Sequence, residues 1–298
     1  VHHVYLDGDF NASIRQLPRF GLLGGAVNYL SVGLPLLMAL DRRRLLSVLA
    51  HEYGHLRGNH GRLSAWIYRT RLSWLKLDES LERKEGLMAG VSQAFFGWYF
   101  PRFAAKTFAL ARQDEYEADR ISAKLLGTSV AAAALTEIAV KGAWYAENSW
   151  PAPWARPASE ALPAGPFAGL RTQLRAAPEP AFAREALRGA MRRVSDVDDT
   201  HPVLRDRLEA FEEKAVIPEW SAKPALDMLA DQGAKWVEHF DREWCREHAN
   251  DWKQHHGYLK RVRERVDALA ASAGRNNADE MVEWADLERR LDTNADVR

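Results

Sequence analysis

Two histidines and a glutamate near residue 50 have the types and the spacing that can bind a metal ion. His51 and His55 are four residues apart, and Glu52 directly follows the first of them. On a helix, side chains at i and i+4 project from one face, so both imidazoles can reach one Zn²⁺ at about 2.0–2.1 Å. A glutamate beside such a pair can take a proton from a water activated by the metal. The motif therefore predicts a zinc site with hydrolytic chemistry.

Two histidines do not complete a zinc site, so a third ligand is expected elsewhere in the chain. A local candidate is His60, because the metzincin peptidases extend the motif as H-E-x-x-H-x-x-G-x-x-H. Gly58 matches that pattern, but His60 comes one position early and Gly61 occupies the ligand position. His60 is therefore a near miss, and a histidine close to the end of the helix is the simpler interpretation.

A second candidate for the third ligand is Glu115, in a stretch rich in carboxylates. Its helical face is otherwise small and apolar, which favours an inward position, and Asp119 lies at i+4 on the same side. The pair fits one carboxylate that binds the metal and one that holds a ligand histidine by its other nitrogen. Asp114 and Glu117 point elsewhere on the helix. A surface helix with salt bridges is the alternative, and it weakens once His51 and the motif around it are considered.

Capping signals and apolar spacing predict the elements that position these side chains. Asp41 is expected to cap a helix from about residue 42 to 63, and four aliphatic residues before His51 indicate that this helix is largely buried. A long helix is expected over Met88–Leu126, with an interruption near Pro101 and a stop at Gly127. The other expected elements are strands over Val4–Leu6, Ala12–Ile14 and Val27–Val32, and helices over Val130–Glu147, Phe182–Val194 and from Val203 onward.

Composition restricts the class of protein. The 298 residues allow one large domain or two modest ones. Lys and Arg together number 41, as do Asp and Glu, so the net charge is zero and a general nucleic-acid binder is disfavoured. Residues 201–298 hold 16 basic and 21 acidic residues, a net charge of −5, so their helices form an acidic extension. Because Cys245 is the single cysteine, no internal disulfide is expected, and a metal site must use His, Asp and Glu.

Three further stretches need interpretation. Phe20–Leu40 is 21 residues without a charge, long enough to span a bilayer, but its glycines and Pro35 favour a strand followed by a helix. Gly86–Pro101 is 16 uncharged residues rich in aromatics, read as a buried helix, with a membrane-surface contact as the alternative. Seven of the 13 prolines fall in 151–180, so 150–180 is expected to be a loop or lid, or a plain linker.

The motifs together resemble the gluzincin peptidases of the family that includes HtpX, BepA, Oma and the CAAX prenyl protease. The resemblance covers most of residues 1–210. It rests on His51-Glu52-x-x-His55 and on Glu115-x-x-x-Asp119 within Glu-Tyr-x-Ala-Asp, supported by weaker matches at Asn11-Ala12, Gly33-Leu34-Pro35 and Thr200-His201-Pro202. The HtpX and prenyl protease relatives carry spanning helices, for which the uncharged runs in this chain are poor candidates.

The resemblance assigns roles to the matching positions. It implies His51, His55 and Glu115 as zinc ligands, Glu52 as the general base and Asp119 as the residue that orients a ligand histidine. It also implies that Val27–Val32 is an edge strand which holds an extended peptide substrate by strand addition. The substrate-binding residues would then be Asn28, Tyr29, Leu30 and Ser31.

His201 precedes a helix in Thr-His-Pro, and three interpretations are open. It donates a hydrogen bond to a developing oxyanion, as a catalytic residue. It binds zinc reversibly and holds the enzyme shut, as is thought for some relatives. Or it is a neighbour of a helix cap without a catalytic role. Arg207 is a weaker candidate for the same neighbourhood.

The sequence thus predicts a predominantly helical α+β, zincin-like metallopeptidase domain over 1–210 and an acidic helical extension over 211–298. The predicted function is zinc-dependent endopeptidase activity on proteins or peptides, with one Zn²⁺ per chain. The alternative is a non-catalytic adaptor or chaperone-like module with a structural zinc. The extension is a candidate surface for a protein partner. The resemblance implies a bacterial protein, membrane-associated or the soluble domain of a membrane-anchored one, with any anchor in a segment absent from this chain.

Overall fold

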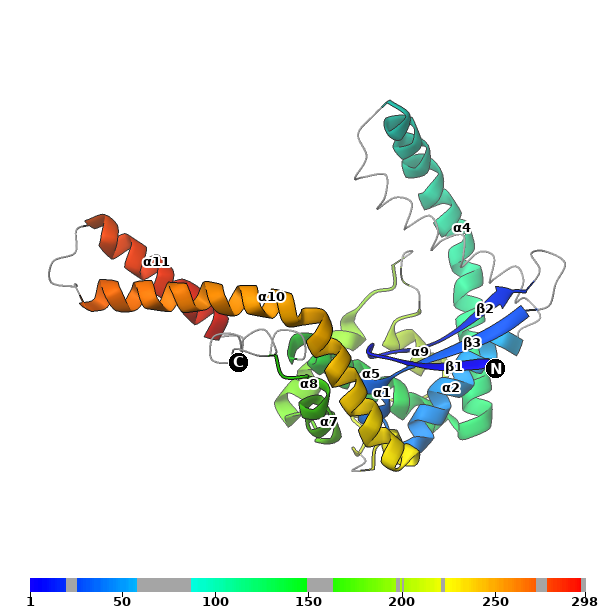
Figure 1. Cartoon of the computed structure of the whole chain (residues 1–298). Coiled ribbons are helices and arrows are strands. Elements are labelled where there is room, and N and C mark those ends of the chain that lie inside the picture. Colours follow the sequence, from blue (N-terminus) through cyan, green and yellow to red (C-terminus); the bar gives the residue numbers. More distant parts are fainter. Residues whose placement is uncertain are drawn as a thin grey trace. The chain divides into compact units, whose positions relative to one another are not determined.

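The computed structural model describes residues 1–19, 26–57, 87–148, 163–196, 199, 201–220, 223–271 and 278–295 (Figure 1). Most of these residues are helical, and three strands form one sheet, so the fold is the predominantly helical α+β fold that the sequence predicts. The strands are β1 (His3–Asp7), β2 (Ala12–Pro18) and β3 (Ala26–Gly33). The helices are α1 (Leu34–Ala39), α2 (Arg42–Arg57), α4 (Leu87–Leu126), α5 (Thr128–Asn148), α7 (Phe167–Arg175), α8 (Pro180–Arg192), α9 (Leu204–Ala210), a 3₁₀ turn (Ala225–Leu229), α10 (Asp231–Ala271) and α11 (Ala278–Ala295).

The chain forms two compact units. The first comprises residues 1–140 and 179–225, and the second comprises residues 141–178 and 226–298. This grouping differs from a simple division at residue 210, since the stretch 141–178 groups with the C-terminal helices. All candidate ligands that the structure describes lie in the first unit.

The sheet has the strand order β1-β3-β2. β3 pairs in parallel with β1, with His3 opposite Tyr29, and antiparallel with β2, with Ile14 opposite Leu30. At the end of β3, a Cβ on Gly33 would lie 1.6 Å from the Asp9 carbonyl oxygen. Only glycine therefore allows β3 to pass this closely behind the turn between β1 and β2.

The prediction that Val27–Val32 is an edge strand is wrong, because β3 is the central strand. Its backbone is already paired on both sides, and beyond β1 the Asn28 N–H and carbonyl bond with His2. Asn28, Tyr29, Leu30 and Ser31 therefore have no free edge on which a peptide could add as a strand. Local sequence patterns identify a strand but not the strands beside it. On one side β3 pairs in parallel with the N-terminal β1, and no local pattern indicates that pairing.

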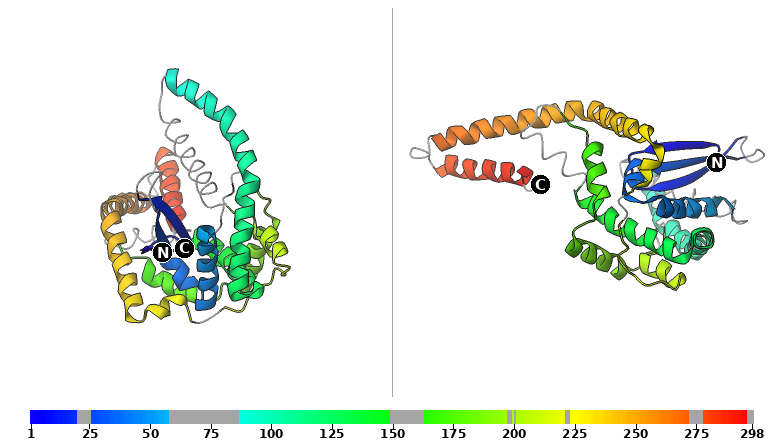
Figure 2. Two further views of the ribbon diagram at one scale, coloured as in Figure 1. Left: turned by 90° about the vertical axis from the view of Figure 1, so that its right-hand side faces the viewer. Right: turned by 90° about the horizontal axis from the view of Figure 1, so that it is seen from below.

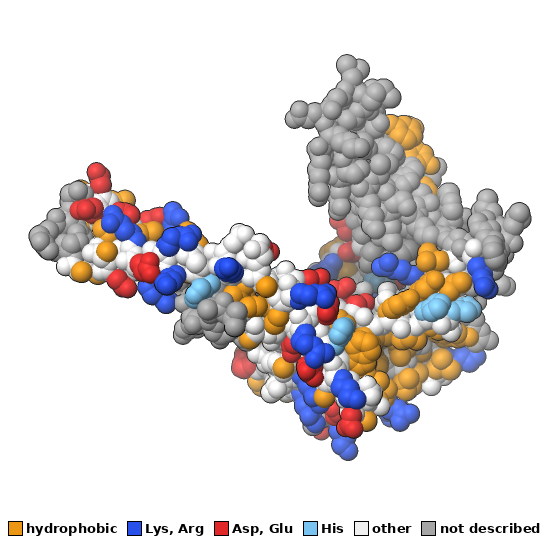
Figure 3. Space-filling model, in the orientation of Figure 1, with side chains coloured by type: hydrophobic (Ala, Val, Ile, Leu, Met, Phe, Trp, Pro, Cys, Tyr) orange, Lys and Arg blue, Asp and Glu red, His pale blue; other side chains and the backbone are white. Residues whose placement is uncertain are grey.

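The two faces of the sheet differ. The rings of His3 and Tyr29 stack at 4.9 Å between centroids, and Tyr5 stacks on Tyr29 at 6.0 Å. Figure 3 shows histidine and hydrophobic side chains side by side over these strands. The opposite face carries the buried pair Ala12 and Val32. The sheet thus covers the core with one face, which is the face that meets the helices.

α1 and α2 begin as the sequence predicts. All six residues of α1 are buried, with Pro35 in its first turn, where a missing N–H costs nothing. Asp41 then caps α2, since its Oδ1 accepts the N–H groups of Arg43 at 2.8 Å and of Arg44 at 3.0 Å. α2 is described to Arg57, and the rest of the predicted helix, with Gly58, His60 and Gly61, lies outside the described residues.

α2 packs closely against α4 along a seam of small residues. A Cβ on Gly54 would lie 2.7 Å from the Ala118 Cα, so the two backbones approach as near as glycine permits. Two helical turns away, the hydroxyls of Ser47 and Ser122 are 2.7 Å apart, and both are buried. This close approach brings long side chains on the two helices within reach of one another.

α4 runs from Leu87 to Leu126 without a break, so the predicted interruption near Pro101 is wrong. A proline removes one backbone hydrogen bond, and in this helix the turns on either side of it continue. The stop at Gly127 is confirmed, because this glycine takes a φ of +97°. α5 follows directly.

α5 packs against α8 and α9 in the first unit. Val140 of α5 packs with Ala183 and Leu187 of α8, and Ala131 and Ala132 of α5 pack with Leu208 and Phe211 at the end of α9. The helix predicted from Val203 onward is interrupted after α9, where Glu212 takes a φ of 57° that a continuous helix does not allow. These contacts fix the stretch between α8 and α9, which carries His201.

The second unit contains α7, α10 and α11. α7 lies inside the stretch 150–180 that the sequence predicts as loop or lid, so part of that stretch is helical; residues 149–162 lie outside the described residues. Asp241 of α10 accepts the N–H groups of Phe167 at 2.7 Å and of Ala168 at 3.1 Å. α10 and α11 lie side by side (Figure 2), tied by two hydrogen bonds from Arg265 to Glu283 at 2.9 and 2.7 Å.

None of the described helices is by itself long and apolar enough to cross a bilayer. One pair, Phe108–Leu126 with Thr128–Asn148, has the necessary length and composition when taken together, across a bend of 119°.

Candidate metal centre

The two histidines of the motif lie in the C-terminal half of α2 and face α4. His51 is buried, and His55, one turn later, keeps about a quarter of its side chain exposed. Their Nε2 atoms are 3.2 Å apart. Two ring nitrogens that face one another at this distance in a largely buried site need a shared partner, because imidazole lone pairs repel unless a proton or a cation lies between them.

Glu115 of α4 supplies the third donor. Its Oε2 lies 3.5 Å from the His51 Nε2, and its Oε1 lies 3.4 Å from the His55 Nε2. Four tetrahedral ligands at 2.0–2.1 Å from zinc are about 3.3–3.4 Å from each other. The two histidine nitrogens at 3.2 Å are close to that spacing, each of them lies 3.4–3.5 Å from one of the two Glu115 oxygens, and one donor atom from each residue lies within 4.8 Å of the others.

The donors fit zinc in kind as well as in spacing. Two imidazole nitrogens and one carboxylate are the donor set of a catalytic zinc site with an open fourth position. Among the described residues, His51, His55 and Glu115 are also the only group of three such side chains whose donor atoms meet. The other histidines that the structure describes on α10, His239, His248, His255 and His256, belong to no such group.

Asp119 lies behind the first candidate ligand, His51, and contacts its other ring nitrogen. Its Oδ1 lies 2.9 Å from the His51 Nδ1, one helical turn after Glu115. A carboxylate at this atom fixes the tautomer with a proton on Nδ1 and so leaves the Nε2 lone pair for a metal. Arg207 of α9 binds the same carboxylate with two nitrogens, at 2.8 and 2.5 Å, and its own side chain is 12% exposed.

Glu52 points from α2 to the sheet. Its carboxylate is buried, and its Oε2 accepts the backbone N–H of Ile14 at 3.1 Å. Ile14 lies in β2, which pairs with β3 on one side and, among the described residues, with no strand on the other. The general-base candidate is therefore held between α2 and an outer strand of the described sheet.

His201 reaches the site from the stretch before α9. Its Nδ1 lies 2.6 Å from the Glu115 Oε2, and its ring centre is 6.2 Å from that of His51. Half of its side chain, 49%, is exposed. The structure thus places it next to a candidate ligand with its other nitrogen, Nε2, available. Thr200, the first residue of the Thr-His-Pro match, lies outside the described residues.

The protonation of the site in the metal-free chain follows from burial and pairing. Burial lowers the pKa of His51, but its hydrogen bonds to Asp119 and Glu115 outweigh burial and raise that pKa to about 9. Burial lowers the pKa of His55 to about 4. Burial alone would raise the pKa of Glu115, and the hydrogen bonds from His201 and His51 hold it well below its usual range. The metal-free triad therefore carries a proton on His51 and a charged Glu115.

Glu52 behaves differently from the other carboxyl groups of the site. Burial raises its pKa, and the nearby imidazole of His51 opposes that change only in part. A carboxylate with a raised pKa is a stronger base, which suits a group that must take up a proton and return it.

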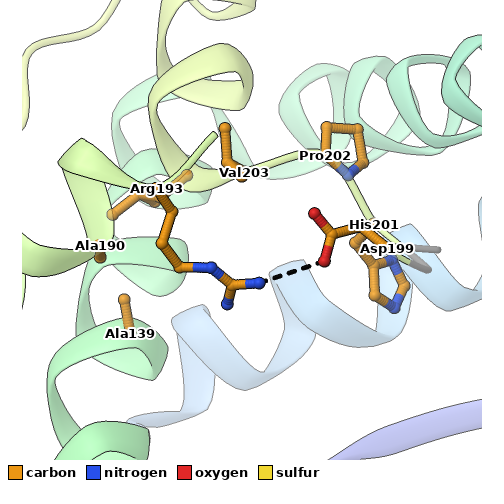
Figure 4. A pocket seen from close by; sticks show the side chains of 8 residues that line it. Ala139, Ala190, Arg193, Asp199, His201, Pro202 and Val203 are labelled. Atoms are coloured by element: carbon orange, nitrogen blue, oxygen red, sulfur yellow. Dashed lines mark hydrogen bonds and ion pairs between the residues drawn. The ribbon is translucent and has the colours of Figure 1, made fainter. Parts of the chain in front are cut away.

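A pocket of about 270 Å³ adjoins the site through His201 (Figure 4). The Arg193 guanidinium points across it to Asp199 and pairs with that carboxylate at 3.1 Å. The rest of the wall is largely apolar and comes from α5, α8, the stretch before α9 and the first residue of α9: Ala139, Ala190, Pro202, Val203 and Leu204.

The structure brings together most of the residues that the sequence singles out. His51, Glu52, His55, Glu115 and Asp119 meet at one place, and His201 contacts them. Arg207, for which the sequence gives only a weak indication, binds Asp119 directly. Its contact joins residues 88 positions apart, so no spacing in the sequence could indicate it.

Comparison with known protein families and proteins gives one match, to a family. A family model described as peptidase family M48 matches residues 20–215, which is more than half of the chain and includes all three donors and the stretch up to the end of α9. No curated protein and no solved structure matches. The matched residues hold the donor set described above, and the chain belongs to peptidase family M48.

Proposed function

We propose that the chain is a zinc-dependent endopeptidase that hydrolyses peptide bonds with water and Glu52 as general base. Family membership indicates a metallopeptidase, and hence a hydrolase of proteins or peptides. The observation that carries the finer proposal is the convergence of His51, His55 and Glu115 at the spacing of zinc ligands. Zinc held by these three residues would supply the Lewis acidity that activates a scissile carbonyl and makes water more acidic.

The residues of the chain divide the remaining work. Glu52 takes a proton from the attacking water and passes it to the leaving amine, which its raised pKa favours. Asp119 and Arg207 keep the His51 ring in the orientation and tautomer that a ligand needs. No covalent intermediate is needed in this scheme.

We assign His201 a role in stabilising the developing oxyanion. Its Nδ1 donates to Glu115, so its Nε2 faces outward from the ligands. A neutral ring with a proton on Nδ1 has only an acceptor at Nε2, so donation to an oxyanion requires the imidazolium form. The charged form is also the one that stabilises developing negative charge best.

The edge that can hold the substrate is that of β2. Ile14 donates its N–H to Glu52 and not to β3, and outward and inward residues alternate along an antiparallel strand. The backbone groups of Ala12, Ile14 and Gln16 therefore point away from β3, and the Ala12 and Ile14 N–H groups already donate to Asn11 Oδ1 and to Glu52, so that a peptide must use the carbonyls or displace these side chains. An extended peptide added there would run past Glu52 and the ligands, which supports β2 in place of β3 as the substrate strand.

The test is a comparison of Glu52→Gln with the native chain, both loaded with one equivalent of zinc. The substrate is β-casein, an unfolded protein that offers many sites, and its fragments are followed by mass spectrometry. Glu52→Gln should bind zinc as well as the native chain and lose activity by about 10²–10⁴-fold. Glu117→Gln, a change of the same kind on α4, is the control and should retain activity.

The alternatives give other results. A structural zinc in an adaptor predicts that Glu52→Gln leaves every function of the chain unchanged. A metzincin site predicts that replacement of His60 abolishes zinc binding and that replacement of Glu115 does not.

A further inference from the structure

Arg112 of α4 makes a cluster of contacts that the catalytic scheme does not use. It lies one helical turn before Glu115, and its guanidinium donates to three acceptors at 2.7 Å each. Nη1 donates to the Ser195 hydroxyl, and Nη2 donates to the Tyr116 hydroxyl and to Asp206 Oδ2. The guanidinium also lies over the rings of Phe108 and Tyr116, at 5.4 and 5.6 Å from their centroids.

Two of those acceptors bracket the stretch that carries His201. Ser195 lies six residues before His201, and Asp206 lies five residues after it, in the first turn of α9. The Ser195 hydroxyl also donates to Asp206 at 3.3 Å and accepts the Val203 N–H at 3.4 Å. One guanidinium therefore attaches to α4 a residue on each side of His201, Ser195 before it and Asp206 after it.

The attachment point is on the same helix as the residues that His201 and Arg207 contact. His201 contacts Glu115, three residues after Arg112, and Arg207 contacts Asp119, seven residues after it. The contacts of Ser195, His201, Asp206 and the neighbouring Arg207 with α4 thus lie within about two helical turns. Arg207 and the packing of α9 on α5 hold the side that follows His201, and Arg112 adds the attachment at Ser195, on the side that precedes it.

We propose that Arg112 is a positioning residue, which fixes the stretch 195–206 on α4 and so holds His201 against Glu115. This inference rests on the proposed function, since it gives His201 a task that needs a fixed position. The planar guanidinium is suited to it, because it can serve three acceptors at once while a lysine ammonium acts as a single point of charge.

The electrostatics of the pair agree with this geometry. The hydrogen bond to Asp206 raises the pKa of Arg112. Burial would raise the pKa of Asp206, and the hydrogen bond from Arg112 reverses that and lowers it. Both groups are therefore charged throughout the range in which a peptidase of this kind is assayed.

The first experiment is a double-mutant cycle of Arg112→Gln and His201→Ala in the zinc-loaded full chain, with β-casein as substrate. If Arg112 acts through His201, Arg112→Gln should lower kcat by about tenfold to a hundredfold, no more than His201→Ala does, with KM within about twofold. In the His201→Ala background, the same change should cost less than about twofold. Arg120→Gln, an exposed arginine on α4, is the matched control and should change neither constant.

The second experiment needs no activity, so it separates this inference from the proposed function. The histidine ring Cε1–H signals are recorded by NMR on the zinc-loaded chain, and the signal missing from His201→Ala is that of His201. Arg112→Gln should move this signal toward the position of exposed histidines and leave those of His51 and His55 in place. Arg120→Gln should move none of them.

Two outcomes would overturn the inference. One is an Arg112→Gln penalty of the same size with and without His201, which is what a general structural role predicts. The other is an unchanged His201 signal in Arg112→Gln. If Arg112→Gln does not fold, Asp206→Asn and Ser195→Ala each remove one attachment, and each should show the same coupling to His201 at a smaller size.

Discussion

Replacement of Asp119 should lower both the free energy of unfolding and the affinity for zinc, and a second substitution at Arg207 can separate the two effects. It is 2% exposed and accepts hydrogen bonds from His51 and from two nitrogens of Arg207. Asp119→Asn keeps the shape but removes the charge that balances a buried guanidinium. Loss of one partner of a buried ion pair costs about 3–5 kcal/mol, and we expect the lower end because the amide oxygen still accepts one hydrogen bond.

The same change should also weaken zinc binding. The His51 ring loses the carboxylate that fixes its tautomer and orientation, and the loss of such a partner lowers metal affinity by about 10–100-fold. The double variant Asp119→Asn with Arg207→Met removes the unpaired charge as well. It should therefore be more stable than Asp119→Asn alone and keep the weakened zinc affinity.

Urea unfolding of the metal-free chain measures the first quantity, and competition with a fluorescent zinc chelator measures the second. The reasoning is refuted if Asp119→Asn binds zinc within about twofold of the native chain, because a carboxylate that orients a ligand must affect affinity. It is refuted equally if the double variant is less stable than the single one, since the buried charge would then not be the cause of the loss.

Two further predictions concern the helix seam and the protonation of the ligands. Gly54→Ala places a Cβ 2.7 Å from the Ala118 Cα, so the two helices must separate. We expect urea unfolding to show a loss of about 1–3 kcal/mol in the free energy of unfolding, and we expect weaker zinc binding. Unchanged values would contradict the close packing of α2 on α4. In the metal-free chain the pKa of His51 is about 9 and that of His55 about 4, so only His51 must lose a proton to bind zinc near neutral pH. Calorimetry at pH 6 in buffers of different ionisation enthalpy should show about one proton released per zinc, and affinity should fall about tenfold for each pH unit below 9; release of no proton would contradict the assignment.

The parts of the site that lie within one helix follow from the sequence. His51, Glu52 and His55 share a turn of α2, and Glu115 and Asp119 share a turn of α4, so a period of 3.6 residues already places each group on one face. The close contact between the two helices is also visible in the sequence, since Gly54, which faces Ala118, lies inside the motif.

Contacts between distant segments could not be predicted in this way. The order of the strands depends on the pairing of β3 with the N-terminal β1, and no local pattern shows that this pairing makes β3 the central strand and not an edge strand. The attachment of Arg207 to Asp119 and that of Arg112 to Ser195 join residues more than 80 positions apart. The sequence does not predict α7, because its nine residues lie among prolines that favour a loop.

Binding of one zinc ion by His51, His55 and Glu115 can be measured as zinc content by elemental analysis. The native chain, Glu115→Ala and the control Glu117→Ala are prepared side by side and reloaded with zinc. We expect one zinc per chain in the native protein and in Glu117→Ala, with a large loss in Glu115→Ala. Full retention of zinc in Glu115→Ala would show that Glu115 is not a ligand.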